Sequence, residues 1–143
     1  MRVLFLCTEN ACRSQMAEGL LRSLSKGGVE SFSAGSAPTS VHPLAVEVMG
    51  DVGIDISMQS SKHLDTFRSE RFDYVITVCD RVKESCPTWP DAIEHIHWKF
   101  DDPAKVTHPT EARRMFVSVR NEIASRVRLF LLSHRFVVDG IAS

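Results

Sequence analysis

The sequence has no excess of charge of either sign. Its 143 residues include 17 Lys and Arg against 18 Asp and Glu, so its formal net charge is -1. A chain without a basic surplus lacks the bulk attraction with which many proteins hold polyanions or anionic membrane surfaces. We therefore expect neither nucleic acid nor a membrane among its partners.

Long apolar runs are also missing. The longest run near the N-terminus is Val3–Leu6, which is too short for the apolar region of a signal peptide or for a membrane span. No repeat, low-complexity segment or shift in composition marks a linker. We therefore expect a cytoplasmic protein with a single catalytic domain over residues 1–143, in which residues 134–143 are a candidate C-terminal extension.

Cysteine is scarce, with four residues, which are Cys7, Cys12, Cys79 and Cys86. A chain of this length can bury a core without covalent cross-links. In a protein without signs of export, such cysteines are more typical of catalysis, redox chemistry or metal binding than of structural disulfides.

The sequence does contain a regular alternation of strand and helix patterns. The predicted strands are Val3–Leu6, Ser31–Ser36, Asp73–Cys79 and Glu94–Phe100. The first predicted helix has the apolar stripe Ala17, Leu20, Leu21 and Leu24, a second begins at Pro43, and a short one covers Ser60–Phe67. A long helix is predicted over Thr110–Leu132, with a buried stripe of Ala112, Phe116, Val119, Ile123, Val127 and Phe130. This order predicts an α/β fold in three layers, with a four-stranded parallel sheet, helices on both faces and an active site at the carboxyl ends of the strands.

The long C-terminal helix carries several arginines. They are Arg113, Arg114, Arg120, Arg126 and Arg128. Acidic residues and serines are interspersed among them, so we interpret these arginines as a solvated helix face and not as a polyanion-binding patch.

The turn between the first strand and the first helix carries the strongest functional signal. Its sequence is C-T-E-N-A-C-R-S, from Cys7 to Ser14. Unpaired backbone N–H groups and the positive end of a helix dipole face such a turn, which therefore binds tetrahedral oxyanions. Arg13 adds a planar guanidinium that can contact two oxygens at once. Among these positive groups, we expect Cys7 to ionise at a lower pH than a free cysteine and to act as a nucleophile.

Two further predicted strand ends, which carry Cys79 and Asp102, should lie beside this turn. An oxyanion attacked by Cys7 expels an oxygen leaving group that needs a proton, and Asp102, which precedes Pro103, is the candidate general acid. Asp101 is the competing candidate.

Cys79 and Cys86 indicate chemistry that a simple hydrolase does not require. A second thiol can attack a Cys7 adduct to form a disulfide, and a third can move that disulfide away. The alternative is a zinc site formed by these two cysteines with His95 and His97, although the C-x6-C and H-x-H spacing is not a standard one.

The sequence resembles the thioredoxin-coupled arsenate reductases. The resemblance rests on the motifs C-T-E-N-A-C-R-S-Q-M-A-E-G, S-A-G, G-I-D-I-S, C-D-R-V-K-E-S-C-P and H-W-K-F-D-D-P-A. These enzymes share the fold of the low-molecular-weight protein tyrosine phosphatases. The resemblance extends from Val3 to about Leu132. It implies that Cys7 attacks arsenate, that Arg13 and the loop amides hold the oxyanion, and that Asp102 protonates the departing hydroxide.

The resemblance also implies a disulfide relay. Cys79 would attack Cys7 as arsenite leaves, and Cys86 would take over the disulfide for thioredoxin to reduce. Thioredoxin would be the electron donor, with no tightly bound cofactor, and we expect a monomer. The loop residues Thr8, Glu9, Asn10, Ala11, Cys12 and Ser14 would bind the oxyanion or support the loop. Among them, Asn10 would hold the shape of the loop and Ser14 would stabilise the thiolate.

Two positions depart from the family pattern. Glu9 replaces a small residue and places a carboxylate on the anion loop. Lys62 replaces an Asp that binds potassium in some members, together with residues that match Asn10, Glu18 and Ser33. Because the Lys62 ammonium could replace the ion, we predict no metal.

Two other functions stay open. A tyrosine phosphatase of the same fold typically has Pro at the position of Gln15 and an aromatic residue at that of Ala104. It also lacks the two distal cysteines. A non-catalytic module that binds anions or senses redox state through the same loop is the third possibility.

Overall fold

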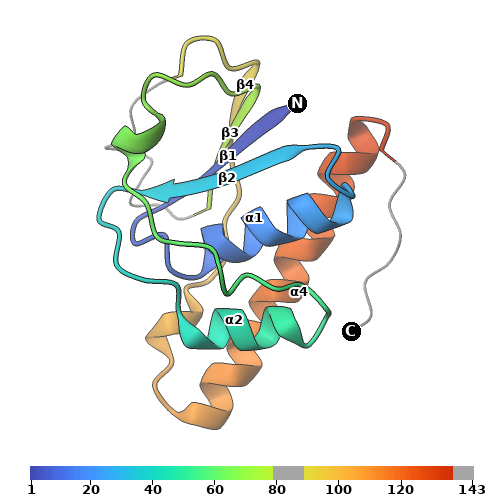
Figure 1. Cartoon of the computed structure of the whole chain (residues 1–143). Coiled ribbons are helices and arrows are strands. Elements are labelled where there is room, and N and C mark those ends of the chain that lie inside the picture. Colours follow the sequence, from blue (N-terminus) through green and yellow to red (C-terminus); the bar gives the residue numbers. More distant parts are fainter. Residues whose placement is uncertain (79–88, 137–143) are drawn as a thin grey trace.

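The structure of the chain is a computed structural model that describes residues 1–78 and 89–136. Four strands form one sheet in the order β2-β1-β3-β4, and every neighbouring pair is parallel (Figure 1). The strands are β1 (Arg2–Cys7), β2 (Glu30–Gly35), β3 (Tyr74–Thr77) and β4 (Glu94–His97). The predicted α/β fold with a four-stranded parallel sheet is confirmed.

The central strand β1 is buried on both faces. Its residues Val3–Leu6 have no exposed surface, as the continuous apolar run predicts for a strand inside a parallel sheet. The register pairs Cys7 at the end of β1 with Gly35 at the end of β2. On the other side, Leu6 pairs with Thr77 and Thr77 pairs with His97. The carboxyl ends of all four strands therefore meet at one edge of the sheet.

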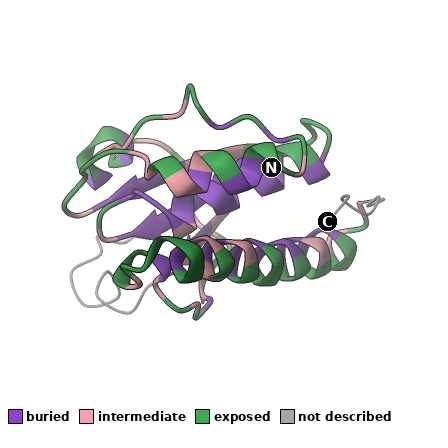
Figure 2. Ribbon diagram, turned by 90° about the horizontal axis from the view of Figure 1, so that it is seen from below, coloured by how far each residue is buried: buried purple, intermediate pink, exposed green. Residues whose placement is uncertain are grey.

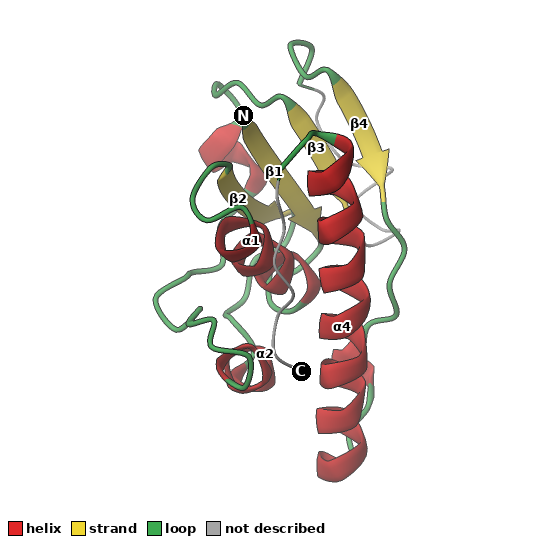
Figure 3. Ribbon diagram, turned by 90° about the vertical axis from the view of Figure 1, so that its right-hand side faces the viewer, coloured by secondary structure: helices red, strands yellow, loops and turns green. Residues whose placement is uncertain are grey.

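Helices α1 (Arg13–Leu24) and α4 (Pro109–Ser133) lie along the same face of the sheet, and α2 (Pro43–Gly50) packs beside them (Figures 1 and 3). Their buried residues face the sheet and one another, while their outer surfaces are exposed (Figure 2). The predicted stripe of α4 is buried throughout and consists of Ala112, Phe116, Val119, Ile123, Val127 and Phe130. The 3.6-residue period thus identified both long helices.

Aromatic side chains cover the opposite face of the sheet. Phe32 on β2 contacts Phe67 and Phe72 at ring-centroid distances of 5.6 Å, and Phe72 contacts Trp89 at 6.2 Å. Phe67 belongs to the short 3-10 helix η1 (Leu64–Phe67). The sheet therefore lies between a helical layer and an aromatic layer built on η1.

The predicted helix over residues 60–67 is wrong for its first half, since only η1 is helical. The preceding residues run beside the end of β2, where His63 forms a bridge with Gly35 and the Lys62 carbonyl accepts a hydrogen bond from the Gly35 N–H at 2.8 Å. This pairing satisfies backbone groups that a helix would otherwise satisfy.

The other predicted boundaries differ at the strand ends. β4 ends at His97, and after Trp98, whose N–H still donates to the Thr77 carbonyl at 2.8 Å, the chain is no longer strand. β3 is described to its end at Thr77, while Cys79 and Cys86 lie outside the described residues. Of the predicted C-terminal extension, His134 contacts the Tyr74 hydroxyl through Nε2 at 2.8 Å, and residues 137–143 lie outside the described part of the chain.

The interpretation of the α4 arginines as a solvated face is wrong for Arg120, which is 3% exposed. Its guanidinium donates to the Val48 carbonyl at 2.9 Å and to Asn121 Oδ1 at 2.9 Å. Burial lowers the pKa of Arg120 below its ordinary value. Arg120 therefore joins α4 to α2.

In residues 1–78 and 89–136, no helix has the length and apolar character needed to cross a membrane.

Candidate active site

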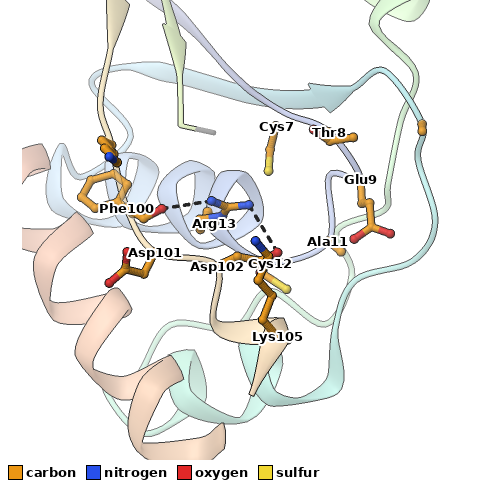
Figure 4. A pocket seen from close by; sticks show the side chains of 12 residues that line it. Cys7, Thr8, Glu9, Ala11, Cys12, Arg13, Phe100, Asp101, Asp102 and Lys105 are labelled. Atoms are coloured by element: carbon orange, nitrogen blue, oxygen red, sulfur yellow. Dashed lines mark hydrogen bonds and ion pairs between the residues drawn. The ribbon is translucent and has the colours of Figure 1, made fainter. Parts of the chain in front are cut away.

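Three segments enclose a cavity of about 570 Å³ at the carboxyl edge of the sheet (Figure 4). The lining residues are Cys7, Thr8, Glu9, Ala11, Cys12 and Arg13 from the loop after β1, Ala37 after β2, and Lys99, Phe100, Asp101, Asp102 and Lys105 after β4. Parallel strands deliver these distant segments to one edge. The structure thus brings the predicted nucleophile Cys7, the predicted anion-binding Arg13 and the predicted acid Asp102 to one cavity.

Arg13 is the first residue of α1, which places its guanidinium directly beside the loop. Nη1 donates to the Phe100 carbonyl at 3.0 Å, and Nη2 lies 3.7 Å from Asp102 Oδ2 (Figure 4). The Nε of Arg13 is buried and has no hydrogen-bond partner among the described residues. A buried donor without a partner is costly, and an oxyanion in the cavity would supply the missing acceptor.

Asp102 is held at both of its carboxylate oxygens. Oδ1 accepts a hydrogen bond from the Ala104 N–H at 3.0 Å and caps the 3-10 helix η2 (Pro103–Lys105), while Oδ2 faces Arg13. The neighbouring Asp101 also lines the cavity, but its side chain is exposed and forms no ion pair within the described part of the chain. The geometry favours Asp102 over Asp101 as the group aligned with the anion loop.

Asn10 holds the loop from behind the cavity. It has a left-handed backbone with φ of 51°, a conformation that Asn tolerates better than most residues. Its Nδ2 donates to Ser14 Oγ at 2.8 Å and to Ser33 Oγ at 2.9 Å, and its Oδ1 accepts from the Lys62 N–H at 2.9 Å. Asn10 and Ser14 are fully buried and do not line the cavity, so their place fits the expected support of the loop.

Cys12 is buried at the start of α1. Burial and then the nearby Asp102 carboxylate raise the pKa of this thiol to about 12. Glu9 lies on the exposed rim of the cavity, and its carboxylate adds to this effect. At neutral pH Cys12 is therefore a neutral thiol, in contrast to the nucleophile that is expected at Cys7.

The region of the family's cation site holds two cationic side chains. Lys62 Nζ lies 4.0 Å from Glu18 Oε1 and donates to the Ser60 carbonyl at 2.7 Å, while Arg22 Nη1 lies 3.1 Å from Glu18 Oε2. The single carboxylate of Glu18 faces both cations, so the charge of this group of side chains is already positive. The residues present therefore do not fit a potassium ion.

The two histidines of the alternative zinc site have other partners. His95 Nε2 accepts a hydrogen bond from the Trp89 N–H at 3.3 Å, and His97 Nδ1 lies 2.7 Å from Thr77 Oγ1. In the part of the chain that the structure describes, no three His, Cys, Asp or Glu side chains gather as a metal site. The two cysteines of that alternative lie outside the described residues.

The structure adds parts of the site that the sequence motifs did not indicate. The Phe100 carbonyl orients Arg13, and the buried Gln15 contacts the loop backbone through its amide. Lys99 and Lys105 line the same cavity as Glu9. The role of a backbone carbonyl cannot be predicted from side-chain patterns. The two lysines lie close to the D-D-P motif in the sequence, and that proximity could have indicated their place in the cavity.

Comparisons with known proteins agree with this geometry. The chain matches the family model for low molecular weight phosphotyrosine protein phosphatases over residues 2–136. It is 43% identical over 131 residues to an arsenate reductase of Shouchella clausii, and the match covers 90% of this chain and 93% of the relative. A solved arsenate reductase in the phosphate binding state superposes with a TM-score of 0.80 at 33% identity and covers 92% of this chain and 97% of that one. A thioredoxin-dependent arsenate reductase of Corynebacterium glutamicum superposes with a TM-score of 0.71 at 33% identity, covering 92% of this chain and 60% of that one.

Proposed function

This chain belongs to the low molecular weight phosphotyrosine protein phosphatase family and, within it, to the arsenate reductases, and we propose that it reduces arsenate to arsenite in arsenic detoxification. The observation that supports this most directly is the cavity that Cys7, Arg13 and Asp102 line together, in which the buried Nε of the half-buried Arg13 has no hydrogen-bond partner among the described residues. Arsenate is a tetrahedral oxyanion of the size and charge that such a loop binds.

In the first step, the Cys7 thiolate attacks arsenic and a Cys7 S–As bond forms. One hydroxyl group leaves arsenic with its bonding electrons and takes a proton from Asp102, so it departs as water. Arg13 and the backbone N–H groups of the loop stabilise the charge on the remaining oxygens. Arsenic is still in the +5 state at this point, because the step exchanges ligands only.

In the second step, Cys79 attacks the Cys7 sulfur. The new S–S bond forms as the S–As bond breaks, and the electron pair of that bond stays on arsenic, which leaves as arsenite in the +3 state. Cys86 then attacks Cys79, which frees Cys7 and leaves a Cys79–Cys86 disulfide. Both of these cysteines lie outside the described residues, and their roles rest on the sequence motif.

A thiol reductant must return the disulfide to two thiols. We infer that thioredoxin serves this purpose, in line with the thioredoxin-dependent enzyme of C. glutamicum that the chain resembles, and that the protein works as a monomer without a tightly bound cofactor. A relay of free thiols requires a reducing compartment, so the cytoplasm is the proposed location.

The test couples arsenate reduction to NADPH oxidation with thioredoxin and thioredoxin reductase. We expect arsenate-dependent NADPH consumption by the unmodified chain and none by Cys79→Ser or Cys86→Ser variants that bind phosphate normally. NADPH oxidation that continues at the same rate in either variant would remove the three-cysteine relay from the mechanism.

A second candidate function is the hydrolysis of phosphomonoesters, because the matching family model describes phosphatases and the first step needs only Cys7, Arg13 and Asp102. The parallel assay follows p-nitrophenyl phosphate hydrolysis. Hydrolysis without arsenate reduction would identify a phosphatase, and phosphate binding without either turnover would identify a non-catalytic anion-binding or redox-sensing module.

A further inference from the structure

We propose that Gln15 is a positioning residue that turns the backbone N–H of Ala11 toward the bound oxyanion, and that Arg22 sets the direction of the Gln15 amide through Gln59. The inference rests on the proposed function, because it assumes that an oxyanion occupies the loop after β1. It adds three side chains, none of which lines the cavity, to the machinery that prepares the loop.

The first observation is a set of hydrogen bonds to the backbone carbonyl of Asn10, here called the tether. Gln15 is fully buried, and its Nε2 donates to the Asn10 carbonyl at 2.9 Å and to the Ser60 carbonyl at 3.0 Å. Ser61 Oγ donates to the same Asn10 carbonyl at 2.7 Å. The carbonyl of Asn10 is thus held by groups that do not line the cavity.

The tether has a geometric consequence for the next residue. In a trans peptide bond the C=O and the following N–H point in opposite directions. Holding the Asn10 carbonyl toward Gln15 therefore turns the Ala11 N–H the other way, and Ala11 lines the cavity. A left-handed backbone at a residue other than glycine persists where its surroundings hold it, and the bonds to the Asn10 carbonyl add to that support.

The second observation is that the direction of each amide is determined by its partners. Gln59 Nε2 donates to Gln15 Oε1 at 2.7 Å and to the Gln15 carbonyl at 3.1 Å, and Gln59 Oε1 accepts from Arg22 Nη2. A guanidinium can only donate and a backbone carbonyl can only accept. The chain of bonds from Arg22 through Gln59 and Gln15 to Asn10 therefore has one possible polarity.

A second path of hydrogen bonds reaches the side chain of Asn10. Asn10 Nδ2 donates to Ser33 Oγ, which donates to Glu18 Oε1 at 2.6 Å, and Glu18 is paired with Arg22. These bonds orient the side-chain amide of Asn10, whereas the bonds from Arg22 hold its backbone carbonyl. Asn10 is thus held through two different groups, by two paths that start from the Arg22–Glu18 ion pair.

The decisive variant is Gln59→Glu. The new carboxylate accepts from Arg22 as before, but it cannot donate to Gln15 Oε1. Gln15 then either keeps its oxygen against a carboxylate or turns that oxygen toward the Asn10 carbonyl, and either arrangement weakens the tether. Gln59 is half-buried, so the chain can accommodate a carboxylate there and fold. If Gln59 had a purely structural role, the new ion pair between the introduced carboxylate and Arg22 would preserve both the stability of the chain and its phosphate affinity.

The matched control is Asn121→Asp. Asn121 Oδ1 also accepts from an arginine, Arg120, and Asn121 does not line the cavity, so this variant makes the same change from amide to carboxylate away from the loop. The readouts are the affinity for inorganic phosphate, measured by calorimetry, and the midpoint of urea unfolding.

We expect phosphate affinity to fall about tenfold in Gln59→Glu, with an unfolding midpoint close to that of the unmodified chain, while Asn121→Asp binds phosphate normally. Arg22→Lys should retain more phosphate affinity than Arg22→Met, because an ammonium still donates to Gln59. Equal phosphate affinities in Gln59→Glu and Asn121→Asp would overturn the inference, as would a loss of affinity that follows a matching loss of stability. If the unmodified chain binds phosphate but does not reduce arsenate, the proposed function fails while this inference stands.

Discussion

Gly35 offers the sharpest test of how the sheet supports the anion loop. It ends β2, pairs with Cys7 and is buried against the backbone of the loop. A Cβ built on Gly35 would lie 2.4 Å from the Thr8 carbonyl oxygen, 2.6 Å from the Cys7 carbonyl oxygen and 3.0 Å from the Asn10 nitrogen. All three atoms belong to the backbone and cannot rotate away as a side-chain atom could.

The Gly35→Ala variant must therefore move the loop. The closest contact has to lengthen from 2.4 Å to at least 3.0 Å, the lower limit for real Cβ contacts. Overpacking of this kind costs about 1–3 kcal/mol of unfolding free energy. A misplacement that approaches 1 Å at a reacting group costs up to about 10²-fold in rate, so we expect kcat/KM for arsenate to fall about 10- to 100-fold.

The assay combines urea unfolding with steady-state arsenate reduction, and Gly50→Ala is the control. Gly50 is exposed at the end of α2, and its Cβ would meet nothing within 4 Å. That variant should keep full activity, with an unfolding free energy unchanged or raised by up to about 1 kcal/mol. If Gly35→Ala also keeps kcat/KM within twofold of the unmodified chain, the loop does not depend on its contact with β2.

Three further predictions concern the cavity itself. Cys7→Ser should abolish arsenate reduction without unfolding the chain, because a hydroxyl has almost no anionic fraction at neutral pH and cannot form a disulfide; turnover by the folded variant would contradict this. Asp102→Asn should slow formation of the arseno-adduct by about 10²- to 10⁴-fold in rapid-quench experiments and leave disulfide exchange unchanged, whereas equal slowing of both steps would point to Asp101 or to a structural role. Burial and the Asp102 carboxylate raise the pKa of Cys12 from 9.0 to about 12, so the unfolded chain loses this proton first and stability should fall between pH 9 and pH 12. Relative to Cys12→Ala, the free energy of unfolding should fall by roughly 1 kcal/mol per pH unit in this range. Urea unfolding at each pH measures it, and the same pH dependence in both proteins would refute the prediction.

Patterns that are local in the sequence predicted the fold well. The apolar run of β1 is a fully buried central strand, and the periodic stripe of α4 is buried at each predicted position. Cys7 and Arg13 share one short turn, so their meeting required only that a strand precede it and a helix follow it. Periodicity and chain connectivity determine such features because they depend on neighbouring residues alone.

Tertiary packing decided those features that depend on contacts between residues far apart in the sequence. Residues 60–63 have a helix-compatible pattern, yet they extend because Gly35 offers a backbone hydrogen-bond partner. In the sequence, Arg120 resembles the solvated arginines around it, but in the structure it is buried because its guanidinium donates a hydrogen bond to the carbonyl of Val48 in α2. The position of Asp102 beside Arg13, and the path from Arg22 to Asn10 through two glutamines, likewise arise only when separate segments pack together. The polarity of a hydrogen bond is set by the partner that faces it, and no local pattern in the chain encodes that partner.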